Sequence, residues 1–221
     1  MMKLTVDDQT FSPGKLLCIG RNYAKHAAEM DSDVPDTPMV FLKPSTALVG
    51  SGGTVEIPAA SSEVHHEVEL VVLIGMGGRH INASDALDHV AGYAVGLDMT
   101  ARDIQSAAKA RRHPWSVAKG FDTFAPLGPI MPASEVGDPQ QLTLGVSVNG
   151  ETRQHGSTEH MIFSVADLIA YCSSVFTLEP GDLIYTGTPE GVGPVAHGDV
   201  LEATFSAGPA LHVTVENASG G

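Results

Sequence analysis

The chain has 221 residues and a net charge of −14, from 12 Lys and Arg residues against 26 Asp and Glu residues. This excess of negative charge argues against nucleic acid and anionic membrane surfaces as partners. No apolar run approaches the roughly 20 residues of a membrane span. The first residues also lack the apolar core of a signal peptide, so we expect a cytoplasmic protein. Two cysteines are too few for a disulfide framework, and we expect reduced, structural thiols.

The N-terminal half of the chain contains two predicted helices. We expect one over residues 24–30 and another from 101 to about 111, the second capped by Thr100 with Asp103. Between them, apolar residues alternate with small ones over 93–97, which predicts a strand.

The C-terminal half is richer in strand signals. Residues 142–148 alternate between apolar and small or polar side chains, and Asn149-Gly150 then indicates a hairpin turn. Ser164 and Asp167 form a Ser-x-x-Asp helix start, and the turn Glu179-Pro180-Gly181-Asp182 should end that helix. Strands outnumber helices without alternating regularly with them, which predicts a mostly β chain with short helices, of the α+β class. Further short strands are predicted at residues 183–185, 200–205 and 211–215.

The stretch HHEVEL, residues 65–70, places two glutamates at the start of an apolar run that predicts a buried strand. Glu67 and Glu69 are two residues apart, so a strand would direct both side chains to the same side. Neighbouring carboxylates repel each other, and Mg²⁺ or Mn²⁺, which prefer oxygen ligands, would remove the conflict. On this stretch alone, two exposed glutamates at a strand end are the simpler interpretation. His65 and His66 either support the glutamates or occupy the strand edge.

A third carboxylate follows the strand predicted over 93–97. Asp98 is placed to join the two glutamates as a metal ligand, although a helix-capping role is the alternative. Arg102 and Gln105 are three residues apart on the following helix and share a face, which could point at the same pocket.

The stretch GRNYAKHAAEM, residues 20–30, supplies groups for proton transfer. His26 and Glu29 lie at positions i and i+3, so a helix would bring them side by side. A carboxylate beside an imidazole raises its basicity and makes a general base that activates water near neutral pH. An ordinary surface pair is the alternative.

Taken together, these stretches resemble the fumarylacetoacetate hydrolase (FAH) family over roughly residues 15–215. Single blocks would be weak signals, but seven in the expected order are specific. The blocks are GRNYAKHAAEM (20–30), VFLKP (40–44), HHEVELVVLIG (65–75), GYAVGLDMTARDIQ (92–105), WSVAKGFDTFAPLGP (115–129), VNGETRQHGST (148–158) and EPGDLIYTGTPEGVGP (179–194).

The resemblance implies a rolled, mixed β-sheet fold of the FAH type, usually found as a homodimer. It implies one catalytic domain over residues 1–221, which includes a short N-terminal segment of about 1–14 and a mobile lid over about 26–36. It also implies roles for ten residues. These are metal ligation by Glu67, Glu69 and Asp98 with Mg²⁺ or Mn²⁺, catalysis by His26, Glu29 and Lys119, and substrate binding by Arg21, Arg102, Gln105 and Thr188.

The activity implied by the resemblance is metal-dependent chemistry on a small 2-oxo acid. The favoured reaction is hydrolysis of the C3–C4 bond of acylpyruvates, such as fumarylpyruvate or acetylpyruvate, to pyruvate and a carboxylic acid. The His26–Glu29 pair favours this reaction because it can activate water. The alternatives are oxaloacetate decarboxylation or tautomerisation, isomerisation of 2-hydroxyhepta-2,4-diene-1,7-dioate, and a catalytically silent protein that binds metal and oxo acid. The presence of His26, Glu29 and Lys119 argues against the last.

Overall fold

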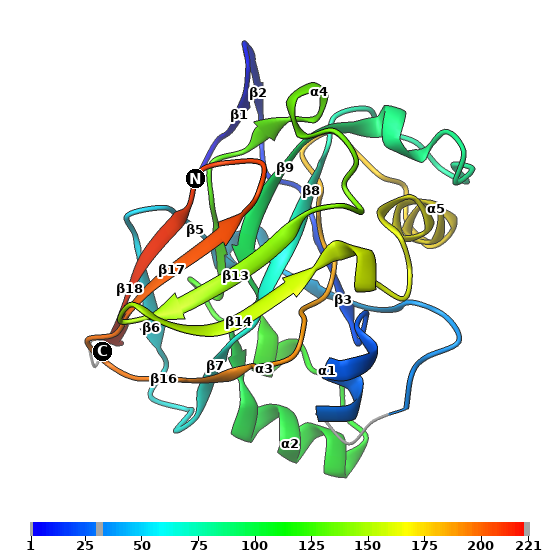
Figure 1. The fold of residues 1–221 in the computed structure, drawn as a ribbon. Coiled ribbons are helices and arrows are strands. Elements are labelled where there is room, and N and C mark those ends of the chain that lie inside the picture. Colours follow the sequence, from blue (N-terminus) through cyan, green and yellow to red (C-terminus); the bar gives the residue numbers. More distant parts are fainter. Residues whose placement is uncertain (1, 30–32, 219–221) are drawn as a thin grey trace.

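Strand β8 (Val68–Ile74) lies in the middle of the largest sheet and is buried along its whole length. The computed structural model describes residues 2–29 and 33–218 (Figure 1). Because β8 is covered on both faces, its sequence is apolar at nearly every position rather than alternating. The eight-stranded sheet has the order β4 (Met39–Lys43), β3 (Leu16–Gly20), β15 (Leu183–Tyr185), β8, β9 (Val90–Leu97), β11 (Ala125–Leu127) and β5 (Leu48–Gly50), with β12 (Met131–Pro132) paired to β9.

This sheet is mixed, since β15 pairs with β3 and β11 with β5 in parallel while its other pairs are antiparallel. A five-stranded sheet lies in front of it in Figure 1. The five strands are, in order, β14 (Glu151–Ser157), β13 (Thr143–Val148), β17 (Val200–Phe205), β18 (Leu211–Asn217) and β6 (Thr54–Ile57). The smaller sheets are β10 (Thr100–Ala101), β7 (Val64–His66) and β16 (Gly193–Val195), and the pair β1 (Leu4–Val6) and β2 (Gln9–Phe11).

The helices are short and connect or cover the sheets. Three of them, α1, α2 and α3, gather at the lower end of the molecule in Figure 1. The α-helices are α1 (Ala24–Glu29), α2 (Arg102–Arg111), α3 (Ser116–Lys119), α4 (Ala133–Val136) and α5 (Val165–Val175), and the 3₁₀ helices are Ser45–Ala47, Ala86–His89 and Thr158–His160. The expected mostly β architecture with short helices is confirmed.

Two hydrophobic cores lie on opposite faces of the eight-stranded sheet. The larger core joins Val68 and Leu70 of β8 to the five-stranded sheet and to α5, where Cys172 is fully buried. The smaller core contains Val71 on the other side of β8, and Cys18 of β3 is fully buried in it. Burial raises the pKa of the Cys172 thiol to about 12 and, aided by Asp98, that of Cys18 as well. Both thiols are free, as expected.

Local sequence signals are confirmed where they depend on short-range geometry. Asn149 and Gly150 have φ angles of 53° and 81°, the two positive values of a type I′ turn, and they join β13 to β14. Ser164 and Asp167 form a complete capping box at the start of α5. That helix ends at Val175, however, and not at the predicted turn over 179–182. The chain leaves it early because Leu178 is buried and pairs with Gly78 in an isolated bridge.

The predicted cap of α2 is wrong. Thr100 belongs to β10, where it pairs with His65, and its hydroxyl donates to the Asp98 carbonyl at 3.1 Å. The Asp103 carboxylate accepts hydrogen bonds from Ser61 Oγ at 2.7 Å and Ser62 N–H at 2.8 Å. Thr100 is therefore used in strand pairing and Asp103 in loop contacts, and the two do not cap the helix as the sequence pattern predicted.

Part of the predicted lid, residues 30–32, lies outside the described residues. The lid over 26–36 therefore stays a prediction. No helix in the part of the chain that the structure describes has the length and apolar character needed to cross a membrane.

The capping box gives a direct stability prediction. Replacing Ser164 by Ala removes the side-chain acceptor of the Asp167 backbone N–H, and we expect a loss of about 1 kcal/mol in the free energy of unfolding. For a chain of this size that corresponds to a fall of roughly 2–4 °C in the thermal midpoint. Ser106→Ala, at an exposed position inside α2, is the matched control and should leave the midpoint unchanged or raise it slightly, because alanine has the higher helix propensity. An equal fall in both variants would contradict the role of the cap.

Candidate metal centre and active site

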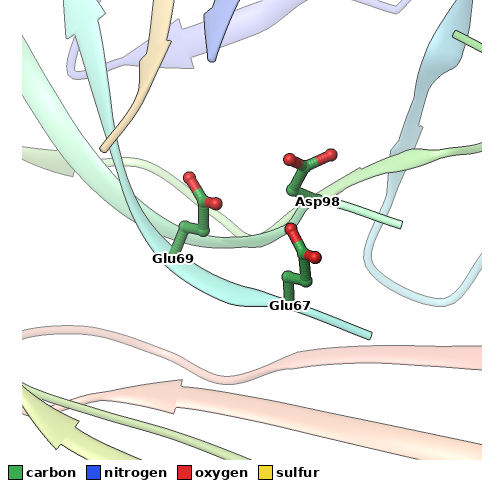
Figure 2. Close-up of side chains that lie close together, drawn as sticks. All are labelled: Glu67, Glu69 and Asp98. Carbon is green, nitrogen blue, oxygen red and sulfur yellow. The ribbon is translucent and has the colours of Figure 1, made fainter. Parts of the chain in front are cut away.

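Three carboxylates gather on one face of the paired strands β8 and β9. Val68 pairs with Leu97, and the Asp98 backbone N–H donates to the Glu67 carbonyl at 2.8 Å, so Asp98 lies opposite Glu67. Glu69 is two residues along the chain from Glu67 and points to the same side. One oxygen from each carboxylate lies within 4.8 Å of the others (Figure 2). The register of the two strands therefore builds the cluster.

All three carboxylates are removed from solvent, with exposed fractions of 5% for Glu67 and 1% for Glu69 and Asp98. The simpler sequence interpretation, two exposed glutamates, is wrong. Burial, together with the neighbouring Asp98 and Glu67 carboxylates, raises the pKa of Glu69 well above its usual range. Among the described residues, the one hydrogen bond that Glu69 accepts comes from the Gly187 backbone N–H at 2.8 Å. Of the three carboxylates, Glu69 thus has the fewest hydrogen-bonding and positively charged partners among the described residues.

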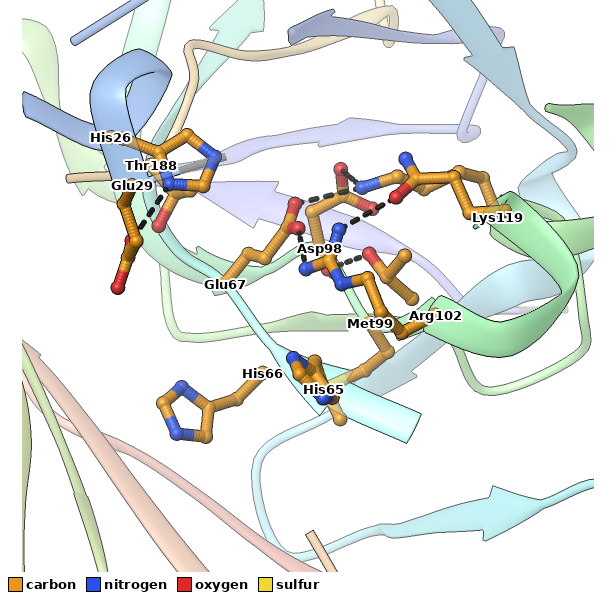
Figure 3. Close-up of polar contacts among 12 residues, drawn as sticks. His26, Glu29, His65, His66, Glu67, Asp98, Met99, Arg102, Lys119 and Thr188 are labelled. Atoms are coloured by element: carbon orange, nitrogen blue, oxygen red, sulfur yellow. Dashed lines mark hydrogen bonds and ion pairs between the residues drawn. The ribbon is translucent and has the colours of Figure 1, made fainter. Parts of the chain in front are cut away.

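Two basic side chains compensate Glu67 and Asp98 (Figure 3). Lys119 Nζ donates to Glu67 Oε2 at 2.7 Å and to Asp98 Oδ2 at 2.6 Å, while Arg102 Nη2 donates to Glu67 Oε1 at 2.5 Å. Burial acts to raise the pKa of Glu67, but Lys119 and Arg102 outweigh it and lower that pKa. Burial likewise acts to lower the pKa of Lys119, but Asp98 and Glu67 outweigh it and raise that pKa. Glu67 and Lys119 are therefore held in their charged forms.

Lys43, the last residue of β4, is a further buried cation at the cluster that the sequence patterns did not single out. Its Nζ lies 2.5 Å from Asp98 Oδ1, an ion-pair distance, although the two groups lack hydrogen-bond geometry. The same ammonium donates to the carbonyls of Met99, at 3.0 Å, and of Phe124. The sequence does contain a signal that could have identified Lys43, because it follows the apolar residues of VFLKP. A lysine buried with such a stretch requires a charged or polar partner for its ammonium group.

The donor set fits a hard divalent cation. Asp98 Oδ1 is buried and accepts no hydrogen bond within the described ranges, and Glu69 accepts a single one there. Both groups thus keep lone pairs available for a metal. Three carboxylates without Cys or His among them suit Mg²⁺ or Mn²⁺ better than Zn²⁺. A dication would also remove the repulsion that raises the pKa of Glu69.

The predicted pair of His26 and Glu29 forms on α1. His26 Nδ1 donates to Glu29 Oε2 at 3.2 Å, and the Gly191 backbone N–H donates to the same carboxylate at 3.1 Å. Because Nδ1 is engaged, Nε2 of the imidazole is the nitrogen left to accept a proton. Asn22, just before the helix, donates to the Thr186 carbonyl at 2.8 Å. The helix is thus held at its base and at its last turn by the segment that follows β15.

One cavity joins the pair to the carboxylates. Every predicted site residue except Glu29, which lies behind His26, borders this cavity. Arg102 Nη1 donates to Gln105 Oε1 at 2.6 Å, so these two side chains face the site together, as expected from their spacing on α2. In Figure 3, His26 and Thr188 lie on one side of Glu67, and Lys119 and Arg102 lie on the other.

The histidines of HHEVEL do not support the glutamates of the cluster. His66 Nδ1 donates to Gln154 Oε1 at 2.9 Å, and His65 bonds to a glutamate outside the site. Gln154, which the sequence patterns did not single out, also accepts from the Val68 backbone N–H at 3.0 Å and donates to Thr188 Oγ1 at 2.9 Å. His66 therefore fixes the amide that positions Thr188.

Comparison with known proteins agrees with this geometry. Residues 15–216 match the family described as Fumarylacetoacetate (FAA) hydrolase C-terminal. The chain belongs to the fumarylacetoacetate hydrolase family. It is 50% identical over 203 residues to Oxaloacetate tautomerase FAHD1, mitochondrial, of Arabidopsis thaliana, with 91% of each chain covered. It is also 50% identical over 189 residues to Oxaloacetate decarboxylase, mitochondrial, of Dictyostelium discoideum, covering 85% of this chain and 87% of that one.

A solved structure of this family is very similar. Fumarylpyruvate hydrolase from Pseudomonas aeruginosa, in complex with Mn²⁺ and pyruvate, is 43% identical and has a TM-score of 0.92, covering 98% of this chain and 96% of that chain. The expected FAH-type fold is confirmed. The chain is a metal-dependent enzyme of the fumarylacetoacetate hydrolase family, and a divalent cation suits its three clustered carboxylates.

The raised pKa of Glu69 gives a testable pH dependence of stability. A carboxyl group whose pKa is higher in the folded than in the unfolded chain binds more protons when folded, so stability falls as pH rises above the unfolded pKa. In metal-free protein, we expect Glu69→Gln to weaken this fall and to raise the thermal midpoint at pH 8 by a few degrees, about 2–4 °C for each kcal/mol gained. Thermal melts from pH 5 to 8 in EDTA measure this.

Adding Mn²⁺ should reverse the order of the thermal midpoints of the wild type and Glu69→Gln. Mn²⁺ should raise the midpoint of the wild type and not that of Glu69→Gln, because the variant lacks one anionic ligand. Glu202→Gln, at an exposed position on β17, is the control and should behave as the wild type. Equal stabilisation of both variants by Mn²⁺ would exclude Glu69 as a ligand.

Proposed function

We propose that this protein is a Mg²⁺- or Mn²⁺-dependent enzyme that acts at C3 of a 2-oxo acid, with keto–enol tautomerisation of oxaloacetate as its main reaction. The observation that carries the proposal is the buried cluster of Glu67, Glu69 and Asp98 beside Lys119 in one cavity. The similarity to an oxaloacetate tautomerase at 50% identity supports the choice of substrate. The related hydrolase bound to Mn²⁺ and pyruvate supports the ligand class.

Glu67, Glu69 and Asp98 would hold the cation. When bound, the cation supplies positive charge that polarises the 2-oxo group and favours loss of a proton from C3. Arg102 and Gln105 would orient the adjacent substrate carboxylate, since Arg102 is fixed by Glu67 and Gln105 and its Nε–H is buried with no partner within the described ranges. A guanidinium held in this way suits a planar carboxylate.

Two groups would move the protons of the tautomerisation. His26 Nε2 would take the proton from C3, because Nδ1 donates to Glu29 and Nε2 is therefore the nitrogen that can accept a proton. Lys119, whose pKa is raised by Asp98 and Glu67 over the opposing effect of burial, would give a proton to the 2-oxo oxygen. One C–H bond is broken and one O–H bond is formed, and exchange with solvent resets both side chains.

Hydrolysis of acylpyruvates is the second candidate, and the His26–Glu29 pair favours it. In that reaction His26 would take a proton from water, which attacks the C4 carbonyl, and the C3–C4 bond would break. The fumarylpyruvate hydrolase of similar structure supports this candidate. The two reactions share the binding of the 2-oxo carboxylate and differ in whether the proton that His26 accepts comes from C3 or from water.

Assays with three readouts separate the candidates. Protein loaded with Mn²⁺ is given oxaloacetate or acetylpyruvate, and enol absorbance, CO₂ and pyruvate are followed with and without EDTA. Because the same two groups, His26 and Lys119, act in reverse when the enol returns to the keto form, the proposal expects rapid loss of the enol signal from oxaloacetate without CO₂. This activity should be lost in EDTA. CO₂ release would indicate a decarboxylase, and pyruvate from acetylpyruvate a hydrolase. Unchanged activity in rigorously metal-free protein would contradict all three.

Substitution of His26 tests its role as a base. We expect His26→Ala to slow oxaloacetate tautomerisation and any acylpyruvate hydrolysis by about 10²–10⁴-fold, the usual contribution of a general base. Decarboxylation of oxaloacetate needs neither proton removal from C3 nor activated water, so any such activity should largely remain. His212→Ala, at an exposed position on β18, serves as the control. Equal loss of every activity would show that His26 positions the substrate or α1 instead.

A further inference from the structure

Two basic side chains in the cavity have no acidic partner among the residues that the structure describes. Arg21 and Lys109 both border the cavity that contains the carboxylates, yet neither forms an ion pair with a residue in 2–29 or 33–218. The chain has 26 acidic residues and only 12 basic ones, so acidic partners are abundant elsewhere. Two cavity cations without an acidic partner in these ranges favour an anionic ligand as the source of the counter-charge.

Arg21 adopts a backbone conformation that is unfavourable for its residue type. Its φ is 61°, in the left-handed region that glycine and asparagine enter readily and that costs energy for a long side chain. The residue is held there by its neighbours, since Gly20 ends β3 and the Asn22 side chain donates to two backbone carbonyls. Backbone strain of this kind is retained at functional sites when it directs a side chain into the site.

Lys109 extends the cavity wall along α2. Arg102, Gln105 and Lys109 are spaced by three and four residues, so they share one helix face, which spans about 10 Å at about 1.5 Å per residue. Lys109 is partly buried, and its Nζ lies 5.6 Å from the centre of the Trp115 ring. Burial, followed by the positive charges of Arg21 and Arg102, lowers the pKa of Lys109. Arg21 and Arg102 therefore lie close enough to Lys109 to repel its ammonium group.

We propose that Arg21 and Lys109 form a second anion subsite, which binds the distal carboxylate of a dicarboxylic 2-oxo acid. This inference rests on the proposed function, because the first carboxylate and the 2-oxo group of the same molecule lie at the Arg102 end of the cavity. The far carboxylate then reaches the Lys109 end, where it cancels the repulsion between the cations. The subsite selects a dianionic 2-oxo acid over an acylpyruvate with an uncharged acyl group.

The order of charges along α2 supports this direction of binding. Arg102 is committed at its Nη2 to Glu67 and at its Nη1 to Gln105, so its end of the cavity belongs to the carboxylate cluster. Lys109 lies two helical turns away, beside Trp115, and has a free ammonium group among the described residues. A dicarboxylic acid bound between the two ends of the cavity would contact the fixed guanidinium of Arg102 at one end and the flexible ammonium of Lys109 at the other. A four-carbon acid and longer diacids differ only in how far the lysine must extend.

Binding without turnover tests the subsite. Titration calorimetry on Mn²⁺-loaded protein compares 2-oxoglutarate, a stable dicarboxylic probe, with 2-oxobutanoate, a monocarboxylic one. We expect Lys109→Met and Arg21→Gly each to weaken 2-oxoglutarate binding by about 10- to 100-fold, as for loss of a charge-assisted hydrogen bond. Binding of 2-oxobutanoate should change less than about threefold. Arg21→Gly also relieves the left-handed backbone, so this variant should fold with an undiminished thermal midpoint.

The same helix offers matched controls. Arg111→Met removes an exposed charge from the last turn of α2, and Arg112→Gly replaces an exposed arginine that has the same positive φ, 56°, outside the cavity. Both controls should leave the binding of both acids unchanged. The matching kinetic readout is an increase of similar size in KM for oxaloacetate with Lys109→Met, with kcat largely retained.

The outcomes distinguish the subsite from the proposed function. If the wild type binds both acids and Lys109→Met weakens both equally or neither, the subsite is wrong while the 2-oxo acid site stands. The subsite is also wrong if the wild type binds 2-oxobutanoate as tightly as 2-oxoglutarate. Binding of neither acid to Mn²⁺-loaded wild-type protein would overturn the proposed function and the subsite with it.

Discussion

The burial of three carboxylates on one side of the β8–β9 pair is the constraint on which the rest of the site depends. Removing such groups from water is costly unless each one gains a charge or a hydrogen-bond donor. Lys119 of α3, Arg102 of α2 and Lys43 of β4 supply the charges, and Gly187 supplies an N–H group. Segments that are far apart in the sequence must therefore meet at one end of the sheet.

Gly187 shows how tightly this requirement restricts the surrounding chain. Its φ is 98°, and a Cβ atom there would lie 2.6 Å from Asn22 Cβ, so only glycine fits. The residue donates to Glu69, and the next one, Thr188, accepts from Gln154. A short loop thus contacts the carboxylate cluster, the base of α1 and the cavity wall at once. The geometry of the cluster and the position of the His26–Glu29 pair are therefore interdependent.

The sequence predicted those parts of the site that follow from local periodicity. Glu67 and Glu69 point to the same side of the strand because side chains in a strand alternate with a period of two residues. His26 and Glu29 are in contact because a helix brings positions i and i+3 together. Lys43 and Gln154 were missed because their partners are distant in the chain: Lys43 pairs with Asp98, and Gln154 bonds to His66. The local signals at Thr100 and Asp103 failed for the same reason, since a sheet pairing and a loop contact outweighed the helix cap.

Each of the two hydrophobic cores contains one cysteine, so the two cores can be observed separately. Cys18 is fully buried in the smaller core under the carboxylate cluster, and Cys172 is fully buried in the larger core on α5. A buried thiol with a raised pKa reacts with alkylating reagents only when its surroundings open. The alkylation rate of each cysteine therefore reports how often its own core opens. Alkylation rates, resolved by peptide mass, would show whether loss of the metal loosens the sheet face that carries the site while the opposite face stays closed.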